Sequence, residues 1–202
     1  MKEQKYDQLL GIETTGTQEW SLHLAQNHPY EATPYQALDV LFHEYEWTDK
    51  DHFVDFGCGK GRFLFYLHHR SGLSGTGIEV NKKRCEEAES NLLRYRERNS
   101  GKPDSIQFKC CPAEAYEVDS QDNRFYFFNP FAVPIFKKVV RQILASAKQH
   151  PRSVDLILYY PSTDYLQFLD IHTSFEIWKE VKIPRWYERN KNERFVIYQF
   201  HR

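Results

Sequence analysis

A chain of 202 residues with 41% hydrophobic and 27% charged side chains can form one packed domain, and this composition excludes long disordered stretches. Its formal net charge of −1 excludes an overall electrostatic field that attracts nucleic acid or an anionic membrane, although a local basic patch is compatible with that sum. No apolar run approaches the roughly 18 residues that a membrane-spanning helix needs, and the polar N-terminus lacks the apolar segment of a signal peptide. We therefore expect a cytoplasmic protein.

The cysteine pattern supports the same location. The four cysteines show neither the C-x-x-C spacing of a zinc site nor the regular spacing of a disulfide framework, which predicts reduced thiols and no metal; they are Cys58, Cys85, Cys110 and Cys111.

From about residue 52 onward, segments of strand type and helix type alternate. Strands are expected at 52–56, 75–80, 105–110, 124–128 and 154–160, and a closing pair of strand-like segments at 174–183 and 194–200. Helical patterns occupy 61–70, the polar segment after residue 80, and the segment that begins near Pro134. This alternation predicts an α/β protein with a doubly wound parallel sheet and helices on both faces.

A glycine-rich turn follows the first expected strand, in the stretch "VDFGCGKGRF" (54–63). Gly57, Gly59 and Gly61 lie at the carboxyl edge of the sheet, where backbone amides and a helix N-terminus can meet a ligand. The dinucleotide fingerprint G-x-G-x-x-G fails because Arg62 occupies its last position, and the chain contains no phosphate loop of the form G-x-x-x-x-G-K-[ST]. Glu79 closes the second strand, where a carboxylate can accept hydrogen bonds from two ribose hydroxyls.

The G-x-G-x-G turn with Asp55 two residues ahead resembles motif I of the class I S-adenosylmethionine-dependent methyltransferases. The resemblance implies that the glycines admit the methionine portion of the cofactor, that Asp55 helps hold its cationic amino end, and that Glu79 binds the ribose. Cys58 belongs to the same cofactor-binding segment, with its side chain either uninvolved or a reactive thiol.

The same resemblance implies a Rossmann-like, doubly wound, mostly parallel seven-stranded sheet with an antiparallel last strand. Residues 51–202 would form the methyltransferase domain and residues 1–50 an N-terminal helical extension, with its clearest helix at 34–45. In the family, residues after the third strand contact the adenine. Ala113 and Glu114 are the matching candidates here, with a surface role for Glu114 as the alternative.

The stretch "RFYFFNPF" (124–131) ends the fourth expected strand at Asn129-Pro130. An amide oxygen and a carbonyl beside a proline can hold an amino group by its two hydrogens, and a neighbouring aromatic ring can stack on a planar acceptor. The stretch is similar to the Asn/Asp-Pro-Pro-aromatic motif IV of amino-group methyltransferases, although the second proline is missing. The resemblance implies catalytic or acceptor-holding roles for Asn129, Pro130 and Phe131. It also implies that Asn129 lies near the cofactor. The alternative is that Asn-Pro only ends the strand.

A segment about 20 residues before the glycine turn, "YEATPYQALDVLF", is similar to the N-terminal motif of one group of adenine-amino methyltransferases. That likeness places Tyr30, Thr33 and Tyr35 near the methionine end of the cofactor. Thr33 is also expected to cap the helix that begins near Pro34, and capping alone is the alternative explanation for this segment.

These features predict an S-adenosylmethionine-dependent methyltransferase that acts on a planar amino or amide nitrogen of RNA, protein or a small molecule. The alternatives are an O- or C-methyltransferase of a small molecule and a non-catalytic module that binds the cofactor. The chain has no room for a separate DNA-recognition domain. The loop at 184–194 mixes basic and aromatic residues, which suits either contacts with nucleic acid or a solvated hairpin.

Overall fold

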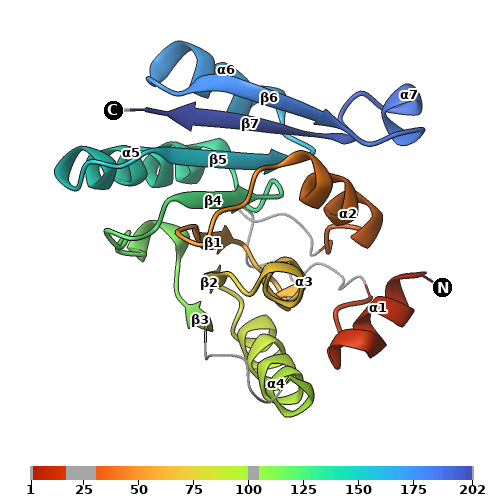
Figure 1. The fold of residues 1–202 in the computed structure, drawn as a ribbon. Helices are drawn as coiled ribbons and strands as arrows, with labels where there is room; N and C mark the ends of the chain where they lie inside the picture. The colour runs from red at the N-terminus through yellow and green to blue at the C-terminus, as the bar shows by residue number, and fades with distance from the viewer. Residues whose placement is uncertain (1, 17–30, 100–104, 202) are drawn as a thin grey trace.

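The computed structural model describes residues 2–16, 31–99 and 105–201. Its centre is a seven-stranded sheet in the order β3-β2-β1-β4-β5-β7-β6 (Figure 1). The strands are β1 (His52–Phe56), β2 (Ser74–Glu79), β3 (Ile106–Cys110), β4 (Arg124–Phe127), β5 (Val154–Tyr159), β6 (Glu176–Lys182) and β7 (Arg194–Phe200). Neighbouring strands from β3 to β5 pair in parallel, whereas β7 pairs antiparallel with both β5 and β6. The expected α/β sheet with its antiparallel last strand is confirmed.

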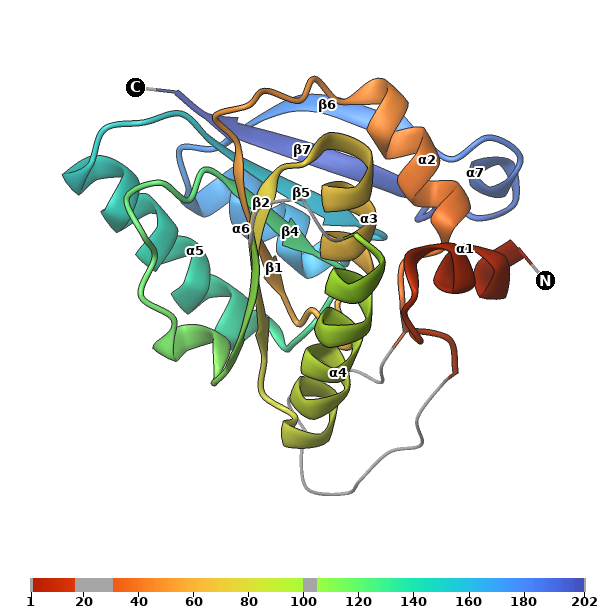
Figure 2. The ribbon, with the colours of Figure 1, turned by 60° about the horizontal axis from the view of Figure 1, so that its bottom comes forward.

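Helices cover both faces of the sheet, as Figure 2 shows with α3 and α4 on one side and α5 on the other. The helices are α1 (Lys2–Leu10), α2 (Tyr35–Glu44), α3 (Arg62–Ser71), α4 (Lys82–Arg98), the short 3-10 helix η1 (Ala113–Ala115), α5 (Val133–Gln149), α6 (Thr163–His172) and α7 (Trp186–Arg189). One buried apolar cluster joins the sheet to α1, α2, α3 and α4, and a second joins its other face to α5 and α6. Strands β1, β4, β5 and β7 therefore contribute side chains to two separate cores, one on each face of the sheet.

The direction of β6 decides which loops lie together. Because β7 is antiparallel to both of its neighbours, β6 runs in the same direction as β5. The segment between β6 and β7, which contains α7, therefore lies at the carboxyl edge of the sheet with the loops that follow β1, β4 and β5. Figure 1 shows α7 at the end toward which β5 points.

Two sequence-based expectations require correction. Cys85 and Cys110 form a disulfide, with their Cα atoms 5.8 Å apart, so the four cysteines are not all reduced thiols. Cys85 lies on the buried face of α4 and Cys110 at the end of β3, and the packing of this helix over the strand brings them together. Thr33 does not cap α2, because the N-cap residue is Pro34 and the first amide of the helix, that of Tyr35, donates to the Glu3 carboxylate of α1 at 3.3 Å.

Within the described ranges, none of the helices is sufficiently long and apolar to cross a membrane.

Candidate active site

The glycine turn after β1 is built on left-handed backbone. Gly57, Gly59 and Gly61 have φ angles of 76°, 55° and 88°, which side chains with a Cβ rarely adopt. A Cβ added to Gly57 would lie 2.3 Å from the Cβ of Pro130, so glycine is also required for close packing at this position. The turn that resembles motif I and the loop that contains Asn129-Pro130 are therefore in direct contact.

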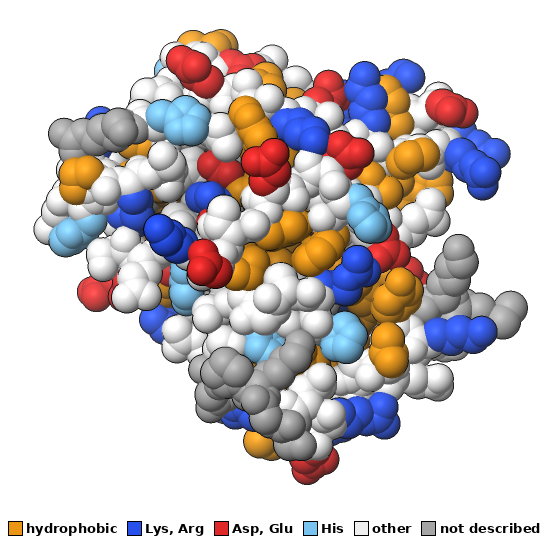
Figure 3. Space-filling view, viewed as in Figure 1, with side chains coloured by type: hydrophobic (Ala, Val, Ile, Leu, Met, Phe, Trp, Pro, Cys, Tyr) orange, Lys and Arg blue, Asp and Glu red, His pale blue; other side chains and the backbone are white. Residues whose placement is uncertain are grey.

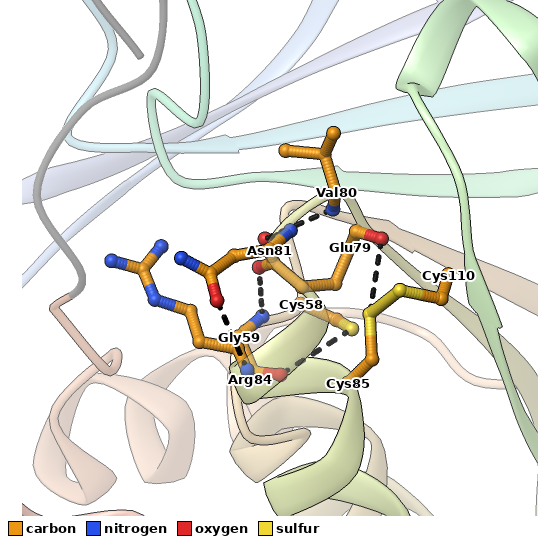
Figure 4. Close-up of a disulfide and its surroundings, with 8 residues drawn as sticks. All are labelled: Cys58, Gly59, Glu79, Val80, Asn81, Arg84, Cys85 and Cys110. Carbon is orange, nitrogen blue, oxygen red and sulfur yellow. Dashed lines mark hydrogen bonds between the residues drawn. A yellow bond between two sulfur atoms is a disulfide. The ribbon is translucent and has the colours of Figure 1, made fainter. Parts of the chain in front are cut away.

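The Glu79 carboxylate is buried beside this turn, with 5% of the residue exposed. Its Oε2 accepts a hydrogen bond from the Gly59 amide at 3.0 Å, and its Oε1 accepts from the amides of Val80 and Asn81 at 3.0 and 2.8 Å (Figure 4). Three backbone donors thus fix the orientation of the carboxylate against the glycine turn. A carboxylate has about four acceptor positions, two on each oxygen, so Oε2 can still accept a hydrogen bond from a hydroxyl group.

Asp55 is the penultimate residue of β1 and has 4% of its surface exposed. Among the described residues, no hydrogen bond and no cation reaches its carboxyl group. Burial, and secondarily the charge of Glu79, raises the pKa of Asp55 well above its usual range. A carboxyl group of this kind favours a cationic partner, since such a partner would offset both the desolvation and the repulsion from Glu79.

The other buried aspartates show that an unpaired acid is an exception in this chain. At the amino edge of the sheet, Asp51 lies 2.9 Å from the Arg124 guanidinium and Asp122 lies 2.7 Å from His52. Asp155 forms an ion pair with Arg124 and accepts a hydrogen bond from Tyr45. Buried acids at the amino edge thus have cationic or hydroxyl partners, whereas Asp55 at the carboxyl edge has none in the described part of the chain.

Cys58 lies between the glycines and is buried, with 8% of the residue exposed. Burial, followed by the charges of Asp55 and Glu79, raises the pKa of its thiol well above the usual value. A thiol that stays protonated is a poor nucleophile, so this environment disfavours the reactive-thiol alternative.

The disulfide borders the same site. The Cys85 Sγ atom lies 3.3 Å from the backbone oxygen of Glu79 (Figure 4). The Cys111 amide donates to the same oxygen at 3.0 Å. Cys110 pairs with Glu79 in the β2–β3 register. The bond therefore joins the first turns of α4 to the strand end that precedes η1, and it braces the segment that carries Ala113 and Glu114.

The two candidates for adenine contacts lie in η1. Ala113 is buried, and Glu114 is half-buried with its backbone oxygen accepting a hydrogen bond from Gln142 on α5 at 2.8 Å.

Asn129 has a left-handed backbone, with a φ angle of 41°. Its side-chain amide joins two loops: Nδ2 donates to the backbone oxygen of Tyr160, and Oδ1 accepts from the Ser162 amide at 3.0 Å. Tyr160, at the matching position after β5, also has a positive φ angle, 50°, and also precedes a proline. Two adjacent strands thus end in left-handed residues that precede proline and that are joined through the Asn129 amide. Because such a backbone is disfavoured for both residues, these turns depend on the surrounding bonds.

The aromatic residues beside Asn129 lie on different sides of the sheet. The Phe131 ring is 4% exposed and packs edge-to-face against Phe127, and its backbone oxygen accepts a hydrogen bond from Tyr165. Phe128 is half-buried, and its ring contacts Tyr159 with a centroid distance of 4.8 Å. A stacking role predicted for the Phe131 ring is therefore not compatible with this conformation, whereas Phe128 is only partly covered.

The segment before α2 is held against the glycine turn by a residue that the sequence did not single out. Arg62, the first residue of α3, is buried and donates hydrogen bonds to the Thr33 backbone oxygen at 3.2 Å and to Thr14 at 2.7 Å. The Thr33 hydroxyl forms a 2.7 Å hydrogen bond with the hydroxyl of Tyr126, the neighbour of Asp55 in the β1–β4 register. Thr33 thus lies on the face of the sheet to which Asp55 belongs.

Tyr35 makes its side-chain contacts with α1 and α3 and with Asp7. It is 1% exposed, its hydroxyl donates to Asp7 at 2.6 Å, and the Arg62 guanidinium lies 4.6 Å from its ring centroid. Its contacts fix α1 to α2. The third residue expected in this segment, Tyr30, lies outside the described residues.

Neither a scan against protein-family models nor a search of curated proteins finds a match for this sequence. Solved structures do match. An RNA methyltransferase from Salinibacter ruber, in complex with S-adenosyl-L-homocysteine, superimposes with a TM-score of 0.57 at 16% identity, covering 84% of this chain and 92% of that one. A candidate RNA methyltransferase from Pyrococcus horikoshii gives a TM-score of 0.58 at 16% identity and covers 100% and 98%.

A geranyl diphosphate C-methyltransferase from Streptomyces coelicolor gives a TM-score of 0.51 at 14% identity and covers 82% of this chain and 76% of that one. The acceptors named for these proteins differ, and the likeness extends over most of each chain. The comparisons show that this chain has the fold of the class I methyltransferases.

Proposed function

We propose that this protein binds S-adenosylmethionine at the glycine turn after β1 and transfers its methyl group to a planar amino or amide nitrogen. The observation that carries the proposal is the buried Asp55 carboxyl, which has no partner among the described residues and lies near the carboxyl end of β1, just before the glycine turn. A ligand with one ammonium group and one ribose also fits these two acids, because the fixed Glu79 carboxylate beside the same turn retains an acceptor position on Oε2.

When bound, the cofactor supplies an electrophilic methyl group on a sulfonium centre. In the proposal, Asp55 pairs with the ammonium group, Glu79 accepts from the ribose hydroxyls, and Gly57, Gly59 and Gly61 allow the ligand to lie close to the backbone. Ala113 and Glu114 border the adenine. The segment before α2 would cover the methionine end of the cofactor, as predicted for Tyr30, Thr33 and Tyr35.

The acceptor would be held by Asn129 and Pro130. Asn129 Oδ1 accepts one hydrogen bond from Ser162 and retains a second acceptor position. Pro130 packs against Gly57, and its carbonyl oxygen is the second proposed acceptor. These two oxygens can accept the two hydrogens of one planar amino group and leave its nitrogen lone pair facing the cofactor side. Catalysis would then rest on alignment, with no strong general base. Phe131 would anchor the loop from the core.

One observation favours the alternatives. Both ends of the Asn129 amide already bond to the loop after β5, as expected of a residue that only fixes a turn. With that role, the protein would be an O- or C-methyltransferase, or a module that binds the cofactor without turnover.

A labelling experiment separates these possibilities. The protein is incubated with tritiated S-adenosylmethionine and fractions of a cell extract, and the labelled product is then treated with nuclease or protease. The proposal predicts label in a product whose hydrolysis yields an N-methylated base or amide. Label on oxygen or carbon contradicts the nitrogen assignment, and cofactor binding without label in any fraction supports the non-catalytic module.

We also propose that the protein is cytoplasmic, and that residues 1–50 form an N-terminal extension of a catalytic domain formed by residues 51–202.

A further inference from the structure

The segment from the last residue of β6 to the first residue of β7 carries a concentration of positive charge, although the net charge of the chain is −1. Residues 182–194, called the basic loop below, contain five cationic side chains and two carboxylates, a net charge of +3. Lysine and arginine side chains gather at the upper right of Figure 3, at the end where Figure 1 shows α7. The cations are Lys182, Arg185, Arg189, Lys191 and Arg194.

One carboxylate and one arginine of the basic loop bond to residues of the sheet, whereas two other arginines do not. Glu193 accepts a hydrogen bond from the Tyr159 hydroxyl at 2.7 Å, which directs it toward the sheet. Arg194 is occupied by Glu180, 3.4 Å away on β6. In contrast, Arg185 and Arg189 are exposed and form no ion pair with any residue that the structure describes. Their charge is therefore available to an anionic partner.

Tyr187 brings two further cations together. The Lys182 and Lys191 ammonium groups lie 4.8 and 4.4 Å from the centroid of its ring. Two ammonium groups repel each other, and the negative face of an aromatic ring offsets part of that repulsion. Phosphate groups of a nucleic acid backbone could bind these ammonium groups, since they carry the opposite charge and several acceptor oxygens.

The basic loop is also joined to the acceptor site. Asn190 donates a hydrogen bond from its side chain to the Tyr160 hydroxyl at 2.7 Å, and the Tyr160 backbone oxygen accepts from Asn129. Tyr160 thus connects the loop to the residue proposed to hold the methyl acceptor. Asn129, Tyr160 and Arg185 are the residues other than glycine with positive φ angles in the described ranges. Disfavoured backbone of this kind gathers at functional sites.

We propose that the basic loop is the docking surface for a single-stranded RNA substrate, whose phosphates bind the cations of the loop while one unpaired base reaches Asn129. This inference rests on the proposed function, because it names the substrate class of the same site. A single strand fits better than a duplex, since the exocyclic amines of unpaired bases have no Watson–Crick partners and the bases can rotate into an active site. A cationic surface that tracks the backbone needs no separate recognition domain.

Fluorescence anisotropy with a labelled 15-nucleotide RNA of mixed, unstructured sequence tests the proposal. Two double variants, Lys182→Gln with Lys191→Gln and Arg185→Gln with Arg189→Gln, should each weaken binding about tenfold at 50 mM salt. The negative slope of log affinity against log salt should become shallower by about 1.4, since each of two lost phosphate contacts on a single strand contributes about 0.7. The matched control is Lys138→Gln with Arg141→Gln on α5, two exposed cations that should leave RNA affinity unchanged.

The role of Tyr187 is tested separately. Tyr187→Phe retains the aromatic ring and should bind RNA like the wild type, whereas Tyr187→Leu should bind several-fold more weakly at an unchanged melting temperature.

The inference is overturned if RNA does not bind at 50 mM salt, if the control variant loses as much affinity as the loop variants, or if single-stranded DNA of the same sequence binds more tightly. Binding of S-adenosylhomocysteine without binding of RNA would contradict the docking surface alone. Loop-dependent RNA binding without any binding of S-adenosylhomocysteine would contradict the proposed function and still support the basic loop as an RNA-docking surface.

Discussion

The replacement Asp55→Asn removes the buried charge on which the proposed cofactor site depends and keeps the size of the side chain. In the proposal, the carboxylate pairs with the cofactor ammonium group in a site with 4% exposure. Removing one member of such a buried pair costs about 3 kcal/mol, which corresponds to about 100-fold weaker binding. Calorimetry with S-adenosylhomocysteine, which carries the same ammonium group, measures this loss directly.

The same variant should be more stable without ligand. Burial and Glu79 raise the pKa of Asp55 above its unfolded value, so the folded chain binds this proton more tightly than the unfolded chain does. The stability that this proton contributes is present below the unfolded pKa, about 3.9, and is lost as the pH rises through the higher folded pKa. Asparagine cannot ionise, so Asp55→Asn should melt at a higher temperature than the wild type at pH 8 and approach it near pH 4.

Ligand binding should release the Asp55 proton. Because an ammonium partner favours the ionised carboxylate, affinity should increase with pH until Asp55 ionises in the free protein. The measured heat should then depend on the ionisation enthalpy of the buffer for the wild type and not for Asp55→Asn. Asp155→Asn is a control, since it removes a paired buried acid at the other edge of the sheet and should lower stability with no change in affinity. If Asp55→Asn binds within threefold of the wild type, the assignment of Asp55 is refuted.

Three further changes probe other parts of the site. Asn129→Ala should leave cofactor affinity within a few-fold and lower methyl transfer at least 100-fold, and surviving turnover would mean that Asn129 only fixes the turn. Gly57→Ala adds a Cβ 2.3 Å from that of Pro130 and should lower the free energy of unfolding in urea by about 2 kcal/mol or more. Gly72→Ala is its control: Gly72 also has a positive φ, but no atom lies within 4 Å of the added Cβ, so the loss should be smaller. Cys85→Ser with Cys110→Ser should lower the free energy of unfolding by about 3 kcal/mol, since the bond closes a loop of 25 residues. A reductant should bring the wild type to the same value, and an unchanged wild type in reductant would show that the disulfide does not form.

The strand pattern of the catalytic core was predictable from local sequence. The first strand lies at its expected position, 52–56, and the β4 strand ends one residue before the expected 124–128. Buried parallel strands read as short apolar runs, and glycine or proline marks their ends, so pattern and turn chemistry agree. The helix α6 was not anticipated, because its polar and aromatic residues follow no clear period.

Features that depend on tertiary contacts could not be predicted. The Cys85–Cys110 bond depends on how α4 packs over β3, and cysteine spacing carries no information about that packing. That none of the described residues pairs with Asp55 is a property of its surroundings in the fold and not of its neighbours in the sequence. In the same way, the close approach of Gly57 to Pro130, and the burial of the Phe131 ring, follow from the register of β1 and β4.

The central claim is that the turn after β1 binds S-adenosylmethionine, and calorimetry of the wild-type protein with S-adenosylhomocysteine tests it most directly. The account predicts saturable binding at one site per chain, with an affinity that rises with pH and is about 100-fold weaker in Asp55→Asn. Absence of binding at millimolar ligand would contradict it.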